Sequence, residues 1–196
     1  MKISVFISIF SAATAFASAI PQTSNVPKVV SAPIEGYEIA PMKWTGQVDK
    51  RSENITLEGT MEEITVKARE INPDFGASPS IEKRGFGKIN CGWGGKGRAG
   101  VLAIKEGIDY LQGIDGYCGL DDGPYKCARV SCSWDSAIWL CNDNDTPLRV
   151  PCKDLGPFAA KIREDCMSSG WSEPMTQGQL FSDQGNWNVI VGKDSC

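Results

Sequence analysis

The stretch CARVSCSWDSAIWLC, residues 127–141, places β-branched and aromatic side chains on both sides of the polar pair Asp135-Ser136. Apolar runs that flank a short polar turn are typical of a β-hairpin. With this pair as the turn, we expect an inner face that carries two tryptophans and two half-cystines. The inner face would hold Val130, Cys132, Trp134, Ala137, Trp139 and Cys141, and the outer face Arg129, Ser131 and Ser133.

Helices are predicted on either side of this hairpin. Apolar residues recur at helical spacing from Arg98 to Gln112. A second helix is predicted to begin at Asp154, as its cap, and to end at Gly170. Cys166 would lie on its inner face and tie the helix to the core.

Two short strands complete the pattern, at Gly87–Asn90 and at Asn186–Val191. The order is therefore strand, helix, hairpin, helix, strand. This order predicts an α+β fold, a small disulfide-stapled sandwich with two helices packed on one antiparallel sheet.

All eight cysteines of the chain follow residue 84. In an oxidising compartment they would most simply form four disulfides. None forms a C-x-x-C motif and the chain has no histidine, so we expect no metal site and no cofactor. The sequence does not choose among the connectivities of Cys91, Cys118, Cys127, Cys132, Cys141, Cys152, Cys166 and Cys196.

Residues 1–19 have the features of a secretory signal peptide. Lys2 supplies the positive charge, Ile3–Phe16 is apolar, and small residues end at Ala19, after which we expect cleavage. The predicted location of the protein is therefore extracellular.

Residues 20–84 differ in composition from residues 85–196, because they lack cysteine and are interrupted by prolines. Two dibasic pairs occur here, Lys50-Arg51 and Lys83-Arg84. Secretory proteases of the kexin type cut after such pairs, so we expect a cut after residue 84 and consider a second one after residue 51. Residues 20–84 would be a pro-region, either holding the mature disulfide-rich domain 85–196 soluble or latent, or serving as a spacer.

Four basic residues and no acidic one lie between Gly85 and Lys105, whereas residues 85–196 as a whole have 11 basic and 14 acidic residues. A basic loop bearing a tryptophan is a candidate contact for an anionic glycan, phospholipid or channel mouth. A solvated loop is the plainer interpretation, and four charges are too few to indicate nucleic acid. The candidate contact residues are Lys88, Trp93, Lys96 and Arg98.

The absence of histidine excludes the Ser-His-Asp and Cys-His catalytic arrangements. The adjacent carboxylates Asp121-Asp122 and Glu164-Asp165 point in different directions and do not by themselves make a two-carboxylate site. We therefore predict a protein that is not an enzyme and has no catalytic residue.

Three short motifs have simple explanations. GKGRAG, residues 95–100, matches a dinucleotide-binding pattern but lacks its parallel βαβ context. CNDNDTP, residues 141–147, lacks the glycine and distant glutamate of a calcium loop. Asn54 and Asn144 begin sequons for glycosylation, the second one next to a proline.

The layout of signal, pro-region ending in Lys-Arg and compact eight-cysteine domain resembles the small cysteine-rich secreted proteins of fungi, including candidate effectors. The segments CARVSCSWDSAIWLCNDN and NWNVIVGKDSC are similar to segments of that group. GKINC, residues 87–91, and the helix–hairpin–helix–strand order are similar to the fungal killer toxins built as small α/β sandwiches. Those toxins act without enzymology, in some cases by blocking calcium channels through basic residues, whereas this domain is acidic.

The resemblance implies a secreted, non-enzymatic, effector- or toxin-like monomer. It would act outside the cell by binding a host or competitor protein, membrane component or glycan, and not nucleic acid. The alternative is a cell-wall or glycan-binding module. A small hydrolase that works without histidine is the least favoured function.

Overall fold

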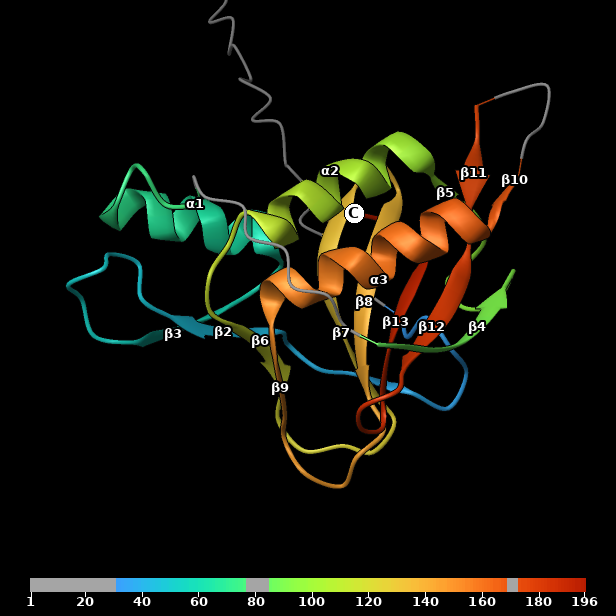
Figure 1. Ribbon diagram of the computed structural model, residues 1–196, viewed down its shortest axis with the longest axis horizontal. Coiled ribbons are helices and arrows are strands. Elements are labelled where there is room, and N and C mark those ends of the chain that lie inside the picture. The colour runs from blue at the N-terminus through green and yellow to red at the C-terminus, as the bar shows by residue number, and fades with distance from the viewer. Residues whose placement is uncertain (1–30, 77–84, 169–172) are drawn as a thin grey trace, which may run out of the picture.

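The computed structural model describes residues 31–76, 85–168 and 173–196. A six-stranded sheet forms its centre (Figure 1). Its first pair of strands is parallel and all its other neighbours are antiparallel. In spatial order the strands are β1 (Glu38–Ile39), β7 (Lys126–Ser133), β8 (Ser136–Asn142), β13 (Trp187–Lys193), β12 (Gly178–Ser182) and β4 (Phe86–Cys91).

Strands β7 and β8 form the predicted hairpin, but its turn lies one residue earlier than expected. Ser133 pairs with Ser136, so the turn residues are Trp134 and Asp135. Both have positive φ, 49° and 53°, as in a type I′ turn. This turn matches the right-handed twist of the paired strands, which explains why the chain turns here.

A bulge in β7 changes the predicted faces of the hairpin. It lies between Arg129 and Ser131, where Val130 is the extra residue. Val130 and Ser131 are both buried, whereas the Arg129 guanidinium lies 5.9 Å from the centre of the Trp139 ring. The expected faces were therefore wrong for these residues. They were correct for the buried Ala137, Trp139 and Cys141 and for the half-buried Cys132, which pack in one cluster.

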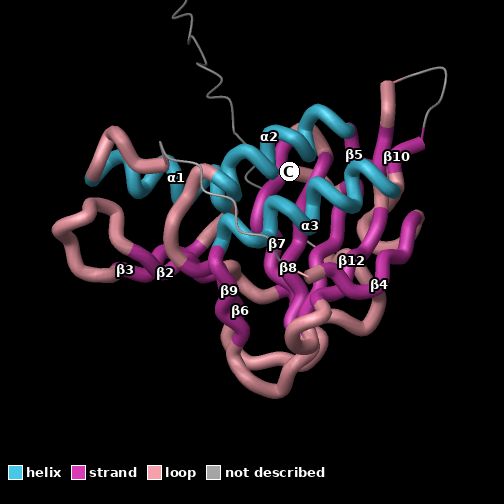
Figure 2. Tube along the Cα trace, viewed as in Figure 1, coloured by secondary structure: helices cyan, strands magenta, loops and turns pink. Residues whose placement is uncertain are grey.

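Helices α2 (Val101–Gln112) and α3 (Cys152–Asp165) lie side by side on one face of the large sheet (Figures 1 and 2). Both predicted helices are confirmed, with different ends. Asp154 lies buried in the first turn of α3 and is not its cap. The helix ends before the expected Gly170, because Cys166 is bonded to Cys91 of β4 and the next residues form a short strand.

Residues 31–76 fold against the rest of the chain. Besides β1, they form strands β2 (Lys43–Gly46) and β3 (Ile55–Glu58) and helix α1 (Met61–Ile71). Strands β2 and β3 join β6 (Tyr117–Leu120) and β9 (Leu148–Pro151) in an antiparallel sheet of four strands. Helix α1 begins with a capping box, in which Thr60 and Glu63 bond to each other's backbone N–H.

The predicted α+β class is confirmed. The expected architecture of two helices packed on one antiparallel sheet is incomplete. The described structure adds a third helix, a parallel strand pair and two further sheets. The smallest sheet contains β5 (Ala99–Gly100), β10 (Met167–Ser168) and β11 (Met175–Thr176).

Hydrophobic side chains fill both faces of the large sheet. The larger core lies under α2 and α3 and includes Ile138 and Leu140 of β8. A smaller core lies on the opposite face around Trp139 and Ile190. Ile34 and Tyr37, which precede β1, pack against this smaller core.

All eight cysteines are paired, as the secretory interpretation predicts. The bonds join β4 and β6 to the two ends of α3, β7 to β8, and β7 to Cys196. They are Cys91–Cys166, Cys118–Cys152, Cys127–Cys141 and Cys132–Cys196.

The turn of the hairpin provides a test of backbone strain. Asp135→Gly should raise the free energy of unfolding by roughly 0.5–1 kcal/mol, because glycine adopts positive φ without steric cost. Asp135→Ala keeps the Cβ atom and should give no such gain. Urea unfolding of both variants measures the difference, and a less stable glycine variant would contradict the strain assignment.

Candidate functional site

Loop 92–98, between β4 and β5, carries most of the predicted contact residues and lies directly on β13. A Cβ atom on Gly94 would come within 2.6 Å of Ile190, and one on Gly95 within 2.8 Å of the Gly192 Cα. Both loop glycines also have positive φ, which favours glycine. Gly94 and Gly95, the second of which begins the GKGRAG motif, thus let the loop approach the strand.

Hydrogen bonds hold this loop in place. The Lys96 N–H donates to the Lys193 carbonyl at 2.9 Å, and the Lys193 N–H donates to the Gly97 carbonyl at 2.7 Å. The side-chain amide of Gln177 donates to the Gly94 carbonyl at 2.6 Å. These contacts make the loop a fixed part of the surface.

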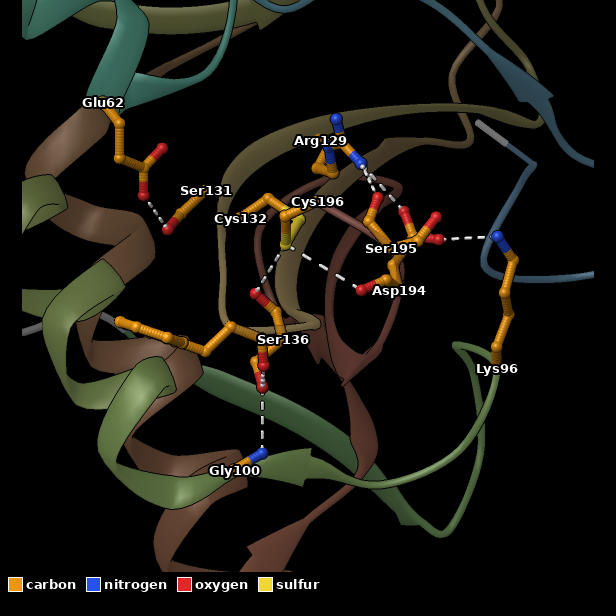
Figure 3. The surroundings of a disulfide bond; sticks show 11 residues. Glu62, Lys96, Gly100, Arg129, Ser131, Cys132, Ser136, Asp194, Ser195 and Cys196 are labelled. Carbon is orange, nitrogen blue, oxygen red and sulfur yellow. Dashed lines mark hydrogen bonds and ion pairs between the residues drawn. A yellow bond between two sulfur atoms is a disulfide. The ribbon is translucent and has the colours of Figure 1, made fainter. Parts of the chain in front are cut away.

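Asp194, close to the C-terminus, is a buried carboxylate with two cationic partners (Figure 3). Its Oδ1 lies 2.6 Å from Lys96 Nζ and its Oδ2 lies 3.1 Å from Arg129 Nη1. The Cys132–Cys196 disulfide lies beside this cluster. Loop 92–98, strand β7 and the C-terminus are therefore joined by charge and by a covalent bond at one point.

The four predicted contact residues occupy different settings. Lys96 faces the buried Asp194, whereas Trp93 and Arg98 are exposed on the same loop. Arg98 has no ion pair or hydrogen bond with any residue that the structure describes. Lys88 is exposed on the edge strand β4, outside the loop.

Because of this difference, Lys96 and Arg98 should respond differently to neutralisation. Lys96→Gln should lower the free energy of unfolding by about 1.5–3 kcal/mol, since it removes a charged hydrogen bond from a buried carboxylate. Arg98→Gln, the matched control, should change it by less than about 0.5 kcal/mol. Urea unfolding of the two variants tests this, and equal losses would show that the Lys96–Asp194 pair carries no special stability.

Three large apolar side chains project from the same region. Trp134 is 83% exposed, Leu102 is 71% exposed and Trp93 is 57% exposed. The Asp194 N–H donates to the Asp135 carbonyl, and Gly100 N–H donates to the Ser136 hydroxyl, so the turn, the loop and the start of α2 adjoin one another. We call this surface the hairpin end; its exposed side chains are Trp93, Arg98, Leu102 and Trp134.

Trp134 was expected on the inner face of the hairpin, and Leu102 was not among the predicted contact residues. A turn placed at Trp134 and Asp135 would have predicted the exposure of Trp134, because a residue at the tip of a hairpin points away from both faces. Leu102 departs from the apolar stripe of its helix, which is buried at Ile104, Ile108 and Leu111. An apolar residue outside the buried stripe of an amphipathic helix is expected to face solvent.

On the face of the sheet away from α2 and α3, a polar network connects residues 31–76 to the loop after β8. The Tyr37 hydroxyl donates to Asp143 Oδ1 at 2.7 Å, and the Asn188 amide donates to Asp143 Oδ2 at 2.9 Å. Gln179 donates in turn to Asn188. Burial and the hydrogen bond to Asp143 both raise the pKa of Tyr37 well above its usual range. Asp143 of the motif CNDNDTP is therefore the hydrogen-bond partner of Tyr37.

The raised pKa of Tyr37 predicts a specific loss of stability at alkaline pH. A group with a raised pKa in the folded state stabilises fully below its ordinary pKa, here 10.0, and loses this contribution as the pH rises further. At pH 7, Tyr37→Phe should lower the free energy of unfolding by about 0.5–1.5 kcal/mol, through one lost hydrogen bond. Urea unfolding from pH 8 to 11 should show this difference shrinking above pH 10; a constant difference would refute the assignment.

Three of the four adjacent carboxylates, Asp121, Glu164 and Asp165, serve as ion-pair partners. Asp121 accepts a hydrogen bond from Lys43 Nζ at 2.5 Å, and this bond lowers the pKa of Asp121. Glu164 and Asp165 pair with basic residues of their own helix. No cluster of three or more His, Cys, Asp or Glu side chains suited to a metal ion occurs among residues 31–76, 85–168 and 173–196.

The predicted processing and modification sites differ in accessibility. Lys50 and Arg51 are exposed in the loop between β2 and β3, and Asn54 is exposed at its end. The side-chain amide of Asn144 donates to Asn142 and to the Asn186 carbonyl, so a glycan there would displace two hydrogen bonds. Ala19 and the pair Lys83-Arg84 lie outside the described residues.

Two cavities lie where residues 31–76 meet the rest of the chain. One, of about 330 Å³, lies between α1 and α2 and is lined by Arg69, Glu106 and Tyr110 among others. The other, of about 830 Å³, lies between the loop after β2 and residues 113–117. Both depend on residues 31–76 for one wall.

No protein-family model, curated protein or solved structure matches this chain. None of the helices in the described residues has the length and apolar character needed to cross a membrane.

Proposed function

We propose that this chain is a secreted, non-enzymatic, effector- or toxin-like protein that binds a host or competitor component outside the cell through its hairpin end. The observation that carries the proposal is Trp134. It is 83% exposed and has a φ of 49°. A bulky residue in this backbone region is strained, and strain of this kind concentrates at functional sites.

The surroundings of Trp134 support a binding role because they are rigid. The Cys132–Cys196 disulfide lies just before the turn, and the Asp194 N–H donates to the Asp135 carbonyl at 3.1 Å. Backbone hydrogen bonds to Lys193 also fix loop 92–98 on β13. A preorganised surface loses little conformational entropy when it binds a partner.

The chemistry of the hairpin end favours a protein or membrane component as partner. Tryptophan and arginine are enriched among the residues that dominate binding energy. Leu102 adds apolar area, and Arg98 adds a positive charge that the described structure leaves unpaired. A partner with an apolar contact surface beside an anionic group would complement these side chains.

Several features support the wider interpretation. The predicted signal peptide and four disulfides fit an extracellular location. The absence of histidine and the engagement of the adjacent carboxylates by cations favour binding over hydrolysis. The resemblance to fungal effectors and killer toxins points to the same class, with a monomer as the acting species.

Binding of the labelled protein to intact fungal and plant cells tests the proposal. Trp134→Ser should weaken binding by roughly 30-fold, the scale of a hot-spot residue worth about 2 kcal/mol. Tyr117→Ser is the matched control, since Tyr117 is 53% exposed on β6, away from the hairpin end. Equal binding by both variants would exclude the hairpin end as the contact surface.

A glycan-binding module is the second candidate, favoured by the exposure of both Trp93 and Trp134. Aromatic rings stack on the apolar faces of sugars. Sedimentation with insoluble chitin or β-glucan distinguishes the two candidates. Retention of the protein, lost in Trp134→Ser and kept in Trp134→Phe, would support glycan binding, whereas cell binding without polysaccharide retention would support a protein or membrane partner.

A further inference from the structure

Residues 31–76 are held against the rest of the chain without a disulfide. All eight cysteines lie in residues 85–196 and pair among themselves. The covalent connection between the two parts is the backbone of residues 77–84, whose sequence ends in Lys83-Arg84. We call residues 31–76 the cover and residues 85–196 the body.

On the face away from α2 and α3, the cover lies over an apolar surface of the body. Ile34 and Tyr37 pack on the smaller core, and β1 extends the large sheet beyond β7 as a parallel strand. The Tyr37 hydroxyl bonds to Asp143 of the body. The covered body residues are Cys127, Ala137, Trp139, Cys141 and Ile190.

At a second place, the cover inserts a tryptophan into the body. Trp44 of β2 is completely buried, and its Nε1 donates to the Asp115 carbonyl at 2.9 Å. The ring lies against Gly116, where a Cβ atom would come within 2.7 Å of Nε1. Strand β2 pairs here with β6, at Trp44 and Cys118. The Trp44 ring is therefore enclosed by Gly116 of the body and by Phe75 of the cover, whose ring centre lies 5.4 Å away.

Helix α1 makes the third contact. Its Glu62 accepts a hydrogen bond from the Ser131 hydroxyl of β7 at 2.5 Å. Its buried side chains join the core under the helices, together with those of the preceding strand and loop. The buried apolar residues of the cover are Met42, Trp44, Val48, Met61, Ile64, Ala68 and Phe75.

The body keeps its own framework apart from the cover. Strands β7, β8, β13, β12 and β4 are continuous in the sheet, and α2 and α3 pack on them and on each other. All four disulfides staple this framework. The cover adds strands at the outer edges of β7 and β6 and does not separate any two neighbouring body strands.

We propose that the cover is a separable, noncovalent ligand of the body, and that the body beneath it is a binding surface for an extended chain with an inserted aromatic side chain. The cover itself occupies this surface by strand pairing along β7 and β6 and by Trp44. A cut after residue 84 turns it into an exchangeable chain. Its departure exposes two strand edges and the Trp139 face, which accept another chain in the same manner. This proposal does not rest on binding at the hairpin end, although the cover also contacts loop 92–98, where the Gly95 N–H donates to the Pro33 carbonyl at 2.7 Å.

Exchange between cut molecules tests the proposal directly. The full secreted chain carries Lys50→Gln and Arg51→Gln, so that a Lys-Arg-specific protease cuts only after residue 84. Cut protein is prepared with and without isotope labelling, mixed without reductant, and measured by native mass spectrometry. We expect intact two-chain complexes before mixing and heavy–light hybrids afterwards. In denaturant without reductant, the two chains should separate completely.

Variants identify the contacts that hold the cover. In mixtures with the wild type, a Trp44→Ala cover should be displaced, with at least about a 10-fold preference of the bodies for the wild-type cover. Val66→Ala is the control, because Val66 is 62% exposed on α1; its cover should exchange evenly.

Circular dichroism of the body after removal of the cover completes the test. The proposal expects retained β-sheet and tryptophan signals, with increased binding of a hydrophobic dye that the added cover reverses. A body that unfolds without its cover, or labelled and unlabelled covers that never exchange, would show that the two parts are one inseparable fold. Either result would overturn the proposal and leave the hairpin-end function standing.

Discussion

Strand β8 is buried along its whole length, from Ser136 to Asn142, and the rest of the structure depends on this constraint. Side chains alternate between the two faces of a strand, so a strand buried throughout needs a layer on each side. Ile138 and Leu140 meet the layer of helices α2 and α3. Trp139 and its neighbours on the other face meet Ile34 and Tyr37. The central strand is therefore covered by a helical layer on one face and by the segment that precedes β1 on the other.

The two layers are held by different physical means. The helical layer is stapled, because Cys166 bonds to Cys91 and Cys152 bonds to Cys118. The opposite layer is held by strand pairing, the Tyr37–Asp143 hydrogen bond and apolar contact. A disulfide limits the conformations of the unfolded chain, whereas these other contacts are lost when the segment leaves. The protein thus combines a layer fixed by disulfides with a layer held only by noncovalent contacts.

The turn at the hairpin end carries residues that make it less stable than a turn of glycine and asparagine would be. Glycine and asparagine relieve positive φ in a type I′ turn, yet this turn contains Trp134 and Asp135. The nearby Lys96–Asp194–Arg129 cluster and the Cys132–Cys196 bond compensate for the strained turn by fixing its base. Exposing the apolar tryptophan ring to water is unfavourable in the free protein, but a ring on a rigid support is well suited to contact a partner. The strained, exposed Trp134 is therefore consistent with the proposed binding role.

The sequence by itself determined the helices, the hairpin and the paired state of the cysteines, because helical periodicity, strand alternation and redox chemistry are local or compositional properties. Signals for residues 31–76 were also present: Met42, Trp44, Gly46 and Val48 alternate as a strand would, and Thr60 with Glu63 forms a capping signal. The tertiary structure alone decided the disulfide partners, the bulge at Val130 and the different settings of Lys96 and Arg98. These features depend on residues far apart in the chain, such as Lys96 and Asp194, whose proximity exists only after the strands have paired.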